Sequence, residues 1–140
     1  MEALQLPATL DALGPIRDYV SEASKKAGLE RKAAYNLKLA IDEIATNVIL
    51  HGYEEAGLSG EIKISFEMND EKIVLVLEDR GKPYDSRRHE DPSEADLELP
   101  LEERAIGGLG IFLALKGVDG FDYQSENGNN RNVFSMNRPN

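Results

Sequence analysis

The sequence predicts an α+β two-layer sandwich, in which a mixed or antiparallel sheet carries helices on one face. Apolar residues recur at helical spacing in the first third of the chain, and two pairs of strand-like segments follow. A long irregular loop and one apolar helix separate these pairs, which gives the order helices, hairpin, loop, helix, hairpin. With 140 residues, of which 41 % are hydrophobic, we expect a single domain over residues 1–140.

The N-terminal residues predict a short strand and a first helix. Residues 2–6 are expected to form the strand. Thr9 or Asp11 could cap the helix, and Gly28, which follows two lysines, marks its end. The apolar stripe of this helix consists of Leu10, Leu13, Ile16, Tyr19 and Val20.

A second, longer helix is expected from Glu30 to about Tyr53. The residues within roughly 40° of one core-facing line on a helical wheel are Leu37, Ile41, Ile44 and Val48. Glu43, Asn47 and His51 lie at i, i+4 and i+8, in a band roughly 80° to one side. Polar residues at such a margin are often simply solvated. Alternatively, the row faces a cleft, where Asn47 could ligate Mg²⁺ and Glu43 could accept a proton.

Two hairpins are expected in the rest of the chain. Residues 61–68 alternate apolar and polar side chains, and the β-branched run at 72–78 is typical of a more central strand. A tight turn at residues 69–70 joins them. The second hairpin pairs residues 120–125 with residues 132–136, through a turn at 126–131.

The segment directly after the central strand, DRGKPYD at residues 79–85, has two interpretations. Aspartate, glycine and proline are the usual residues of a strand-ending turn. Alternatively, the Asp79 carboxylate accepts a hydrogen bond from an exocyclic amine, and Gly81 lets a flat ring approach the backbone. The irregular segment continues to about Arg104, a length that is typical of lids, binding loops or disordered segments.

A glycine run at residues 107–110, GGLG, precedes an apolar helix. Free N–H groups and the helix dipole can hold phosphate at such a place, although a hinge or close helix packing would also use glycines. The run is not a Walker A loop, because no Gly-Lys-Ser/Thr follows it. It does not open a Rossmann unit either.

Charge and composition exclude several classes of partner. The net charge of −10 argues against nucleic acid and requires that any phosphate site be local. No run of about 18 apolar residues occurs, so we expect no membrane span. The chain has no cysteine, which fits a cytoplasmic location without disulfides or thiolate metal sites.

In this order and spacing, the motifs resemble those of the anti-sigma-factor serine/threonine kinases in the histidine-kinase-like (GHKL) ATPase superfamily, which has the Bergerat fold. The N box of that superfamily is matched by DEIATNVILHGY at residues 42–53. The first glycine box is matched by residues 79–85, and the second by GGLGI at residues 107–111. The resemblance extends over residues 4–136, nearly the whole chain.

By this resemblance, Asn47 would ligate Mg²⁺ and Glu43 would be the general base. Asp79 would bind the adenine amine of ATP, and Gly81 would let the ring approach. The other positions that the resemblance assigns to the nucleotide are Asp85, Arg104, Gly107, Gly108, Leu109 and Gly110, with Gly108 and Gly110 as phosphate donors. Residues 86–106, approximately, would form the lid.

The resemblance implies an ATP-dependent kinase that phosphorylates a small anti-sigma-factor antagonist and that also binds a sigma factor, in a family that often forms homodimers. Three alternatives remain open: a nucleotide-sensing module that binds a partner without phosphotransfer, a plain ATPase, and an unrelated domain with coincidental boxes. Replacement of Glu43 with alanine separates the kinase from the module, because only the kinase needs a base.

Overall fold

A computed structural model describes residues 1–85 and 114–139. The helical elements are η1 (Leu10–Ala12), α1 (Leu13–Ala27), α2 (Arg31–Asn47) and the π-helical η2 (Val48–Glu54). The strands are β1 (Leu4–Pro7), β2 (Glu61–Met68), β3 (Lys72–Asp79), β4 (Gly120–Glu126) and β5 (Asn129–Asn137). Within these two ranges, no helix is both long and apolar enough to cross a membrane.

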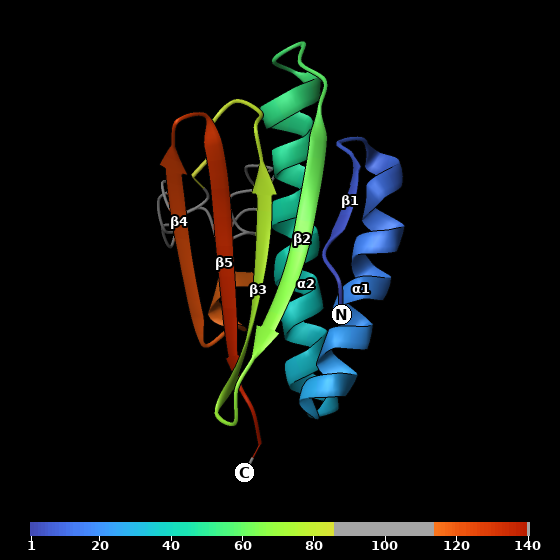
Figure 1. The fold of residues 1–140 in the computed structure, drawn as a ribbon, viewed down its shortest axis with the longest axis vertical. Coiled ribbons are helices and arrows are strands. Elements are labelled where there is room, and N and C mark those ends of the chain that lie inside the picture. The colour runs from blue at the N-terminus through green and yellow to red at the C-terminus, as the bar shows by residue number, and fades with distance from the viewer. Residues whose placement is uncertain (86–113, 140) are drawn as a thin grey trace, which may run out of the picture.

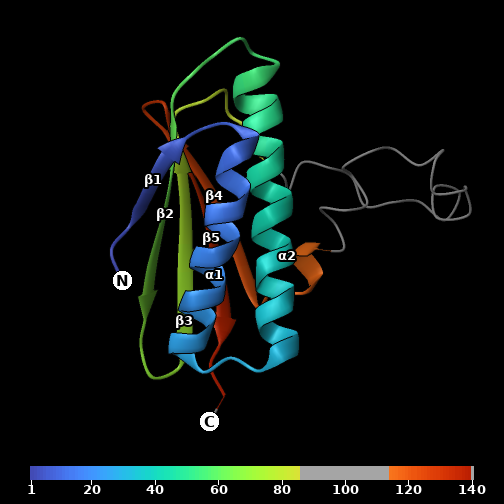
Figure 2. The same ribbon diagram turned by 90° about the vertical axis from the view of Figure 1, so that its right-hand side faces the viewer.

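The strands form one antiparallel sheet in the order β1-β2-β3-β5-β4. Helices α1 and α2 lie side by side on one face of it, so the predicted two-layer sandwich is confirmed (Figures 1 and 2). β3 is the middle strand, as its apolar, β-branched sequence predicted. The predicted first strand is present as well, shifted to Leu4–Pro7 at the edge of the sheet.

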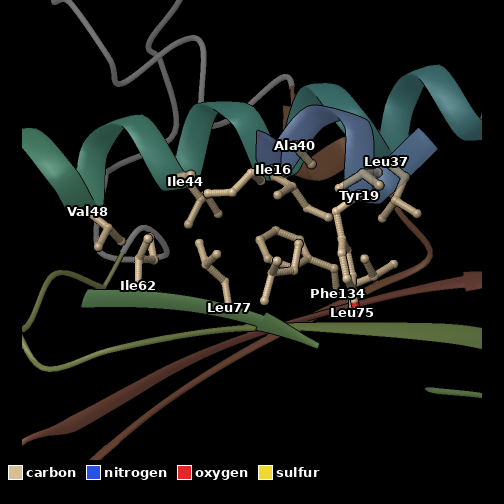
Figure 3. Packing of buried hydrophobic residues seen from close by; sticks show 14 of the residues in the cluster. Ile16, Tyr19, Leu37, Ala40, Ile44, Val48, Ile62, Leu75, Leu77 and Phe134 are labelled. Atoms are coloured by element: carbon tan, nitrogen blue, oxygen red, sulfur yellow. The ribbon is translucent and has the colours of Figure 1, made fainter. Parts of the chain in front are cut away.

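The core lies between the two layers (Figure 3). The predicted stripe of the second helix is buried completely: Leu37, Ile41, Ile44 and Val48 are at most 3 % exposed. Alternate residues of β3 and β5 face it, chiefly Leu75, Leu77 and Phe134. Apolar side chains that repeat every 3.6 residues in the helix and every second residue in the strands therefore form one apolar layer.

The second helix does not keep α-helical geometry to Tyr53. The α-helix ends at Asn47, and residues Val48–Glu54 continue as a π-helix. Such wider turns are rare and are often found at functional sites. Helical periodicity could not predict the change, because the two windings differ by less than one residue per turn.

Two further details differ from the sequence prediction. The first helix begins as the 3₁₀ turn η1, and Thr9 makes no side-chain capping hydrogen bond, although Gly28 ends α1 in the left-handed conformation (φ 70°) as expected. The turn of the second hairpin is shorter than residues 126–131. It consists of Asn127 and Gly128, both with positive φ (53° and 79°), so β5 already begins at Asn129.

The predicted helix after the glycine run is described only from Ala114. Residues 114–116 are helical and Ala114 is buried. A Cβ atom on Gly117 would lie 3.0 Å from Asn36 Cβ, so this helix end packs closely against α2.

Candidate functional site

The central feature of the site is Asp79, the last residue of β3. Its side chain faces the helices and is 4 % exposed. Oδ1 accepts hydrogen bonds from the Gly81 N–H (2.9 Å) and from Asn130 Nδ2 (3.0 Å). Oδ2 is buried and has no partner among the described residues. Burial raises the pKa of Asp79 above its usual value, and the donors Asn130 and Gly81 oppose that rise.

Gly81 lies where two backbone segments cross. A Cβ atom on residue 81 would lie 2.6 Å from the Gly52 carbonyl oxygen and 2.8 Å from Tyr53 Cε2. The next residue, Lys82, donates its N–H to the same Gly52 oxygen (2.8 Å). Close packing inside the protein therefore requires a glycine at this position, whether or not a ligand ring also approaches it.

Tyr53 joins three elements at the end of η2. Its hydroxyl accepts a hydrogen bond from the Arg80 N–H (2.8 Å) and donates one to the Glu61 carbonyl oxygen of β2 (3.1 Å). Burial raises the pKa of this phenol, so it stays a donor at neutral pH. The end of the N box is thereby fixed to the loop that follows Asp79 and contains Gly81.

His51 and Tyr84 form a second contact between the same two segments. Their rings stack at a centroid distance of 5.0 Å with an interplanar angle of 18°. His51 Nδ1 also lies 2.6 Å from Glu55 Oε2. A hollow of about 270 Å³ is lined by His51, Glu55, Ala56, Lys82, Pro83 and Tyr84. His51, the last residue of the predicted polar row, therefore packs on the first glycine box.

Asn47 lies at the junction of α2 and η2 and is 7 % exposed. Its Nδ2 donates to the Glu43 carbonyl oxygen at 2.7 Å, which fixes the amide and leaves Oδ1 for another partner. Glu43, one turn earlier, is half-buried. No group of three or more histidine, aspartate or glutamate side chains within the described ranges could hold a metal. A single amide oxygen suits Mg²⁺ that takes its other ligands from phosphates and water.

Sequence reasoning missed two asparagines of β5. Asn130 (2 % exposed) contacts Asp79 directly, and Asn132 (0 %) follows on the same face of the strand. Both amide atoms of Asn132 lack a partner in the part of the chain that the structure describes. The Asn127–Gly128 dipeptide is a strong signal for a two-residue hairpin turn. Had it been used, the strand would have started at Asn129, with both asparagines in phase with buried Phe134.

The structure brings part of the predicted site together. Gly81 and the neighbouring backbone after Asp79 lie against Gly52 and Tyr53 of η2, which continues directly from the helix that carries Glu43 and Asn47. Asp85 is described and half-buried. The remaining predicted residues (Arg104, Gly107, Gly108, Leu109 and Gly110) and the predicted lid lie outside the described residues.

Comparison with known proteins agrees with this geometry. Residues 6–137 match the family described as the histidine kinase-like ATPase domain. The serine-protein kinase RsbW of Halalkalibacterium halodurans is 27 % identical over 126 residues, which cover 89 % of this chain and 76 % of that protein. The serine-protein kinase RsbW of Oceanobacillus iheyensis is 30 % identical over 111 residues, or 79 % of this chain and 70 % of that protein.

Solved structures share the fold. The RsbU and RsbW domains of Rv1364c from Mycobacterium tuberculosis superpose with a TM-score of 0.64 at 18 % identity; the match covers 99 % of this chain but only 34 % of that longer one. The histidine kinase AdeS of Acinetobacter baumannii gives a TM-score of 0.51 at 14 % identity, covering 100 % of this chain and 70 % of that one. From the family match and the curated relatives, the chain belongs to the histidine kinase-like ATPase family, in the branch of the anti-sigma-factor serine-protein kinases.

Proposed function

We propose that this chain binds ATP with magnesium and transfers the γ-phosphoryl group to a serine or threonine of a small anti-sigma-factor antagonist. The observation that carries the proposal is the Asp79 carboxylate. Two donors satisfy Oδ1, whereas the buried Oδ2 has none among the described residues. An ionised carboxylate only accepts hydrogen bonds, and a buried unpaired acceptor costs about 1–3 kcal/mol. The exocyclic amine of adenine is a donor that would remove this cost.

The pair of Asn47 and Glu43 supports the phosphate end of the proposal. The hydrogen bond from Asn47 Nδ2 to the Glu43 carbonyl oxygen directs the amide so that Oδ1 remains free for a cation. A neutral ligand leaves the full charge of the cation available to the phosphates, which Mg²⁺ would hold and neutralise. Gly108 and Gly110 remain predicted phosphate donors, and Arg104 a predicted phosphate contact.

The proposed chemical step needs one base. The Glu43 carboxylate takes the proton of the acceptor hydroxyl, whose oxygen forms a bond to the γ-phosphorus. The bond between that phosphorus and the β–γ bridging oxygen breaks, and the electron pair leaves with ADP. The products are ADP, the phosphorylated acceptor and protonated Glu43. The name of the curated relatives, serine-protein kinase, supports this class of reaction.

As an anti-sigma factor, the protein would also bind a sigma factor, and the same domain would then serve two protein partners. A homodimer is a separate prediction, which gel filtration with light scattering can test. If nucleotide binding is retained but no phosphate is transferred, the protein is instead a nucleotide-sensing module that regulates its partner.

Calorimetric titration with ATP and magnesium tests the nucleotide site. We expect saturable binding that weakens without magnesium and in Asn47→Ala, and that is lost in Asp79→Asn, because an amide in place of the carboxylate can present a donor to the amine. Asn137→Ala, on an exposed part of β5, is the control and should bind as the unmodified protein does. No binding at millimolar ATP would exclude both the kinase and the ATPase.

Transfer of labelled phosphate from ATP to a purified anti-sigma-factor antagonist tests the chemistry. Glu43→Gln should keep ATP binding and lose on the order of 100-fold or more in transfer rate, the usual contribution of a general base. An undiminished rate in Glu43→Gln would show that another group takes the proton.

A further inference from the structure

A row of polar side chains crosses the sheet beside Asp79. Ser125 of β4, Asn130 of β5 and Asp79 of β3 are direct cross-strand neighbours. Ser125 Oγ donates to Asn130 Oδ1 at 2.7 Å, and the Tyr123 hydroxyl donates to the same oxygen at 3.3 Å. Asn130 Nδ2 then donates to Asp79 Oδ1 at 3.0 Å and to the Gly81 carbonyl oxygen at 2.9 Å.

The hydrogen bonds of this row have only one favourable donor-to-acceptor direction. Both N–H bonds of the Asn130 amide point to acceptors that cannot donate, namely an ionised carboxylate and a backbone carbonyl. A flipped amide would place its oxygen against two other oxygens in a buried site, at a cost of several hydrogen bonds. The hydroxyls of β4 hold the amide oxygen on the other side. The orientation of Asn130 is therefore fixed before any ligand arrives.

We propose that Asn130 is a positioning residue that holds Asp79 ionised, with Oδ2 as the oxygen that has no partner among the described residues, and so makes the site selective for a purine with a 6-amino group over one with a 6-oxo group. This inference rests on the proposed nucleotide binding. An ionised Asp79 accepts a hydrogen bond from adenine but repels the carbonyl oxygen of hypoxanthine. A protonated Asp79 could donate to that carbonyl, and the site would lose its selectivity.

The surroundings of Asp79 agree with this role. The two donors on Oδ1 are neutral, and so is the nearby Tyr53 hydroxyl from η2. Asp79 also lines a hollow together with the charged residues Glu61, Lys63, Glu78 and Arg80. Burial raises the pKa of Asp79, and the hydrogen bond from Asn130 is the larger of the two effects that lower it. Removal of this donor would therefore favour protonation of the carboxyl group in the folded protein.

The test compares affinities for ATP and for ITP, which carries a 6-oxo group, in the full-length protein. Asn130→Ala should reduce the preference for ATP by about 10-fold or more, the size expected when a hydrogen bond to a charged group is lost. Ser125→Ala, at an exposed position that should not affect folding, should reduce it by a smaller factor. Asn137→Ala is the matched control on β5 and should keep the full preference.

A second measurement does not depend on nucleotide. Titration of the Asp79 carboxyl carbon by NMR in the ligand-free protein should show a higher pKa in Asn130→Ala than in the unmodified protein. An unchanged ATP preference in folded Asn130→Ala would overturn the proposal, and so would an unchanged Asp79 pKa. If the unmodified protein binds neither nucleotide, the proposed function is wrong and the selectivity role falls with it, while the NMR titration still decides whether Asn130 holds Asp79 ionised.

Discussion

Gly81→Ala distinguishes two reasons why residue 81 is a glycine: approach of a ligand ring, and close packing inside the protein. If the residue serves only to let a ligand ring approach, alanine should impair nucleotide binding and leave the ligand-free protein as stable as before. The structure predicts otherwise, because the new Cβ would lie 2.6 Å from the Gly52 carbonyl oxygen and 2.8 Å from Tyr53 Cε2. Neither neighbour is the end of a flexible side chain, so the loop itself must move.

The size of the effect follows from what that movement breaks. The hydrogen bonds from the Lys82 N–H to Gly52 and from the Arg80 N–H to Tyr53, both 2.8 Å long, connect the loop to η2. Overpacking typically costs about 1–3 kcal/mol, and each weakened hydrogen bond adds about 0.5–1.5 kcal/mol. We expect Gly81→Ala to lower the free energy of unfolding by about 2–6 kcal/mol without nucleotide.

Urea denaturation of the ligand-free protein measures this change. Asn137→Ala, at an exposed position of β5, is the control and should change the free energy of unfolding by less than about 0.5 kcal/mol. A Gly81→Ala variant whose midpoint matches that of the unmodified protein would refute the packing argument and leave ligand approach as the reason for the glycine.

Three further changes have expected outcomes. Tyr53→Phe removes the acceptor of the Arg80 N–H and the donor to Glu61, and should cost about 1–3 kcal/mol in the same urea assay, with weaker ATP binding. Asp79→Asn should raise stability near neutral pH although it abolishes ATP binding. Burial raises the pKa of Asp79 in the folded state, so the unmodified protein loses stability as the pH rises from the unfolded-state pKa through the folded-state pKa. The gain in stability of Asp79→Asn should therefore vanish in acid, below both pKa values. A gain that persists in acid would contradict burial of the charge as its cause. Phe134→Ala, at the centre of the core, should cost about 3–5 kcal/mol in thermal or urea unfolding.

The sequence predicted the fold well where a single period decides the structure. The apolar stripe of α2 and the alternation in β2 and β3 repeat without interruption. β2 and β3 lie within one residue of their predicted bounds, and α2 begins within one residue of its predicted start, although its α-helical geometry ends at Asn47. The second hairpin was predicted less well, because the polar residues Asn130 and Asn132 interrupt the apolar pattern on the inward face of β5. These asparagines are buried because they belong to the polar end of the core, next to Asp79.

Candidate site residues could be named from the sequence, but not the contacts that connect them. Asp79 was named from motif spacing, but one of the two hydrogen bonds that orient it, and the anchor of the loop after it, come from residues far away in the chain. Asn130 lies 51 positions after Asp79, and Tyr53 lies 27 positions before Arg80. Only the register of the sheet and the path of η2 bring such partners together, and neither can be read from local sequence.

The π-helix η2 connects two parts of the proposed site. It begins directly after Asn47 and ends where Gly52 and Tyr53 bind the loop that follows Asp79. A shift of this loop would therefore move the carboxylate of Asp79, which is proposed to bind the base. It would also move the end of η2, which directly follows Asn47, the residue proposed to ligate the cation. Because the two ends of the nucleotide would be held by segments that contact each other, binding of the base and binding of the phosphates should be cooperative. Adenosine alone should then bind much more weakly than its share of the contacts suggests, and calorimetry with adenosine, ADP and ATP in turn would reveal this difference.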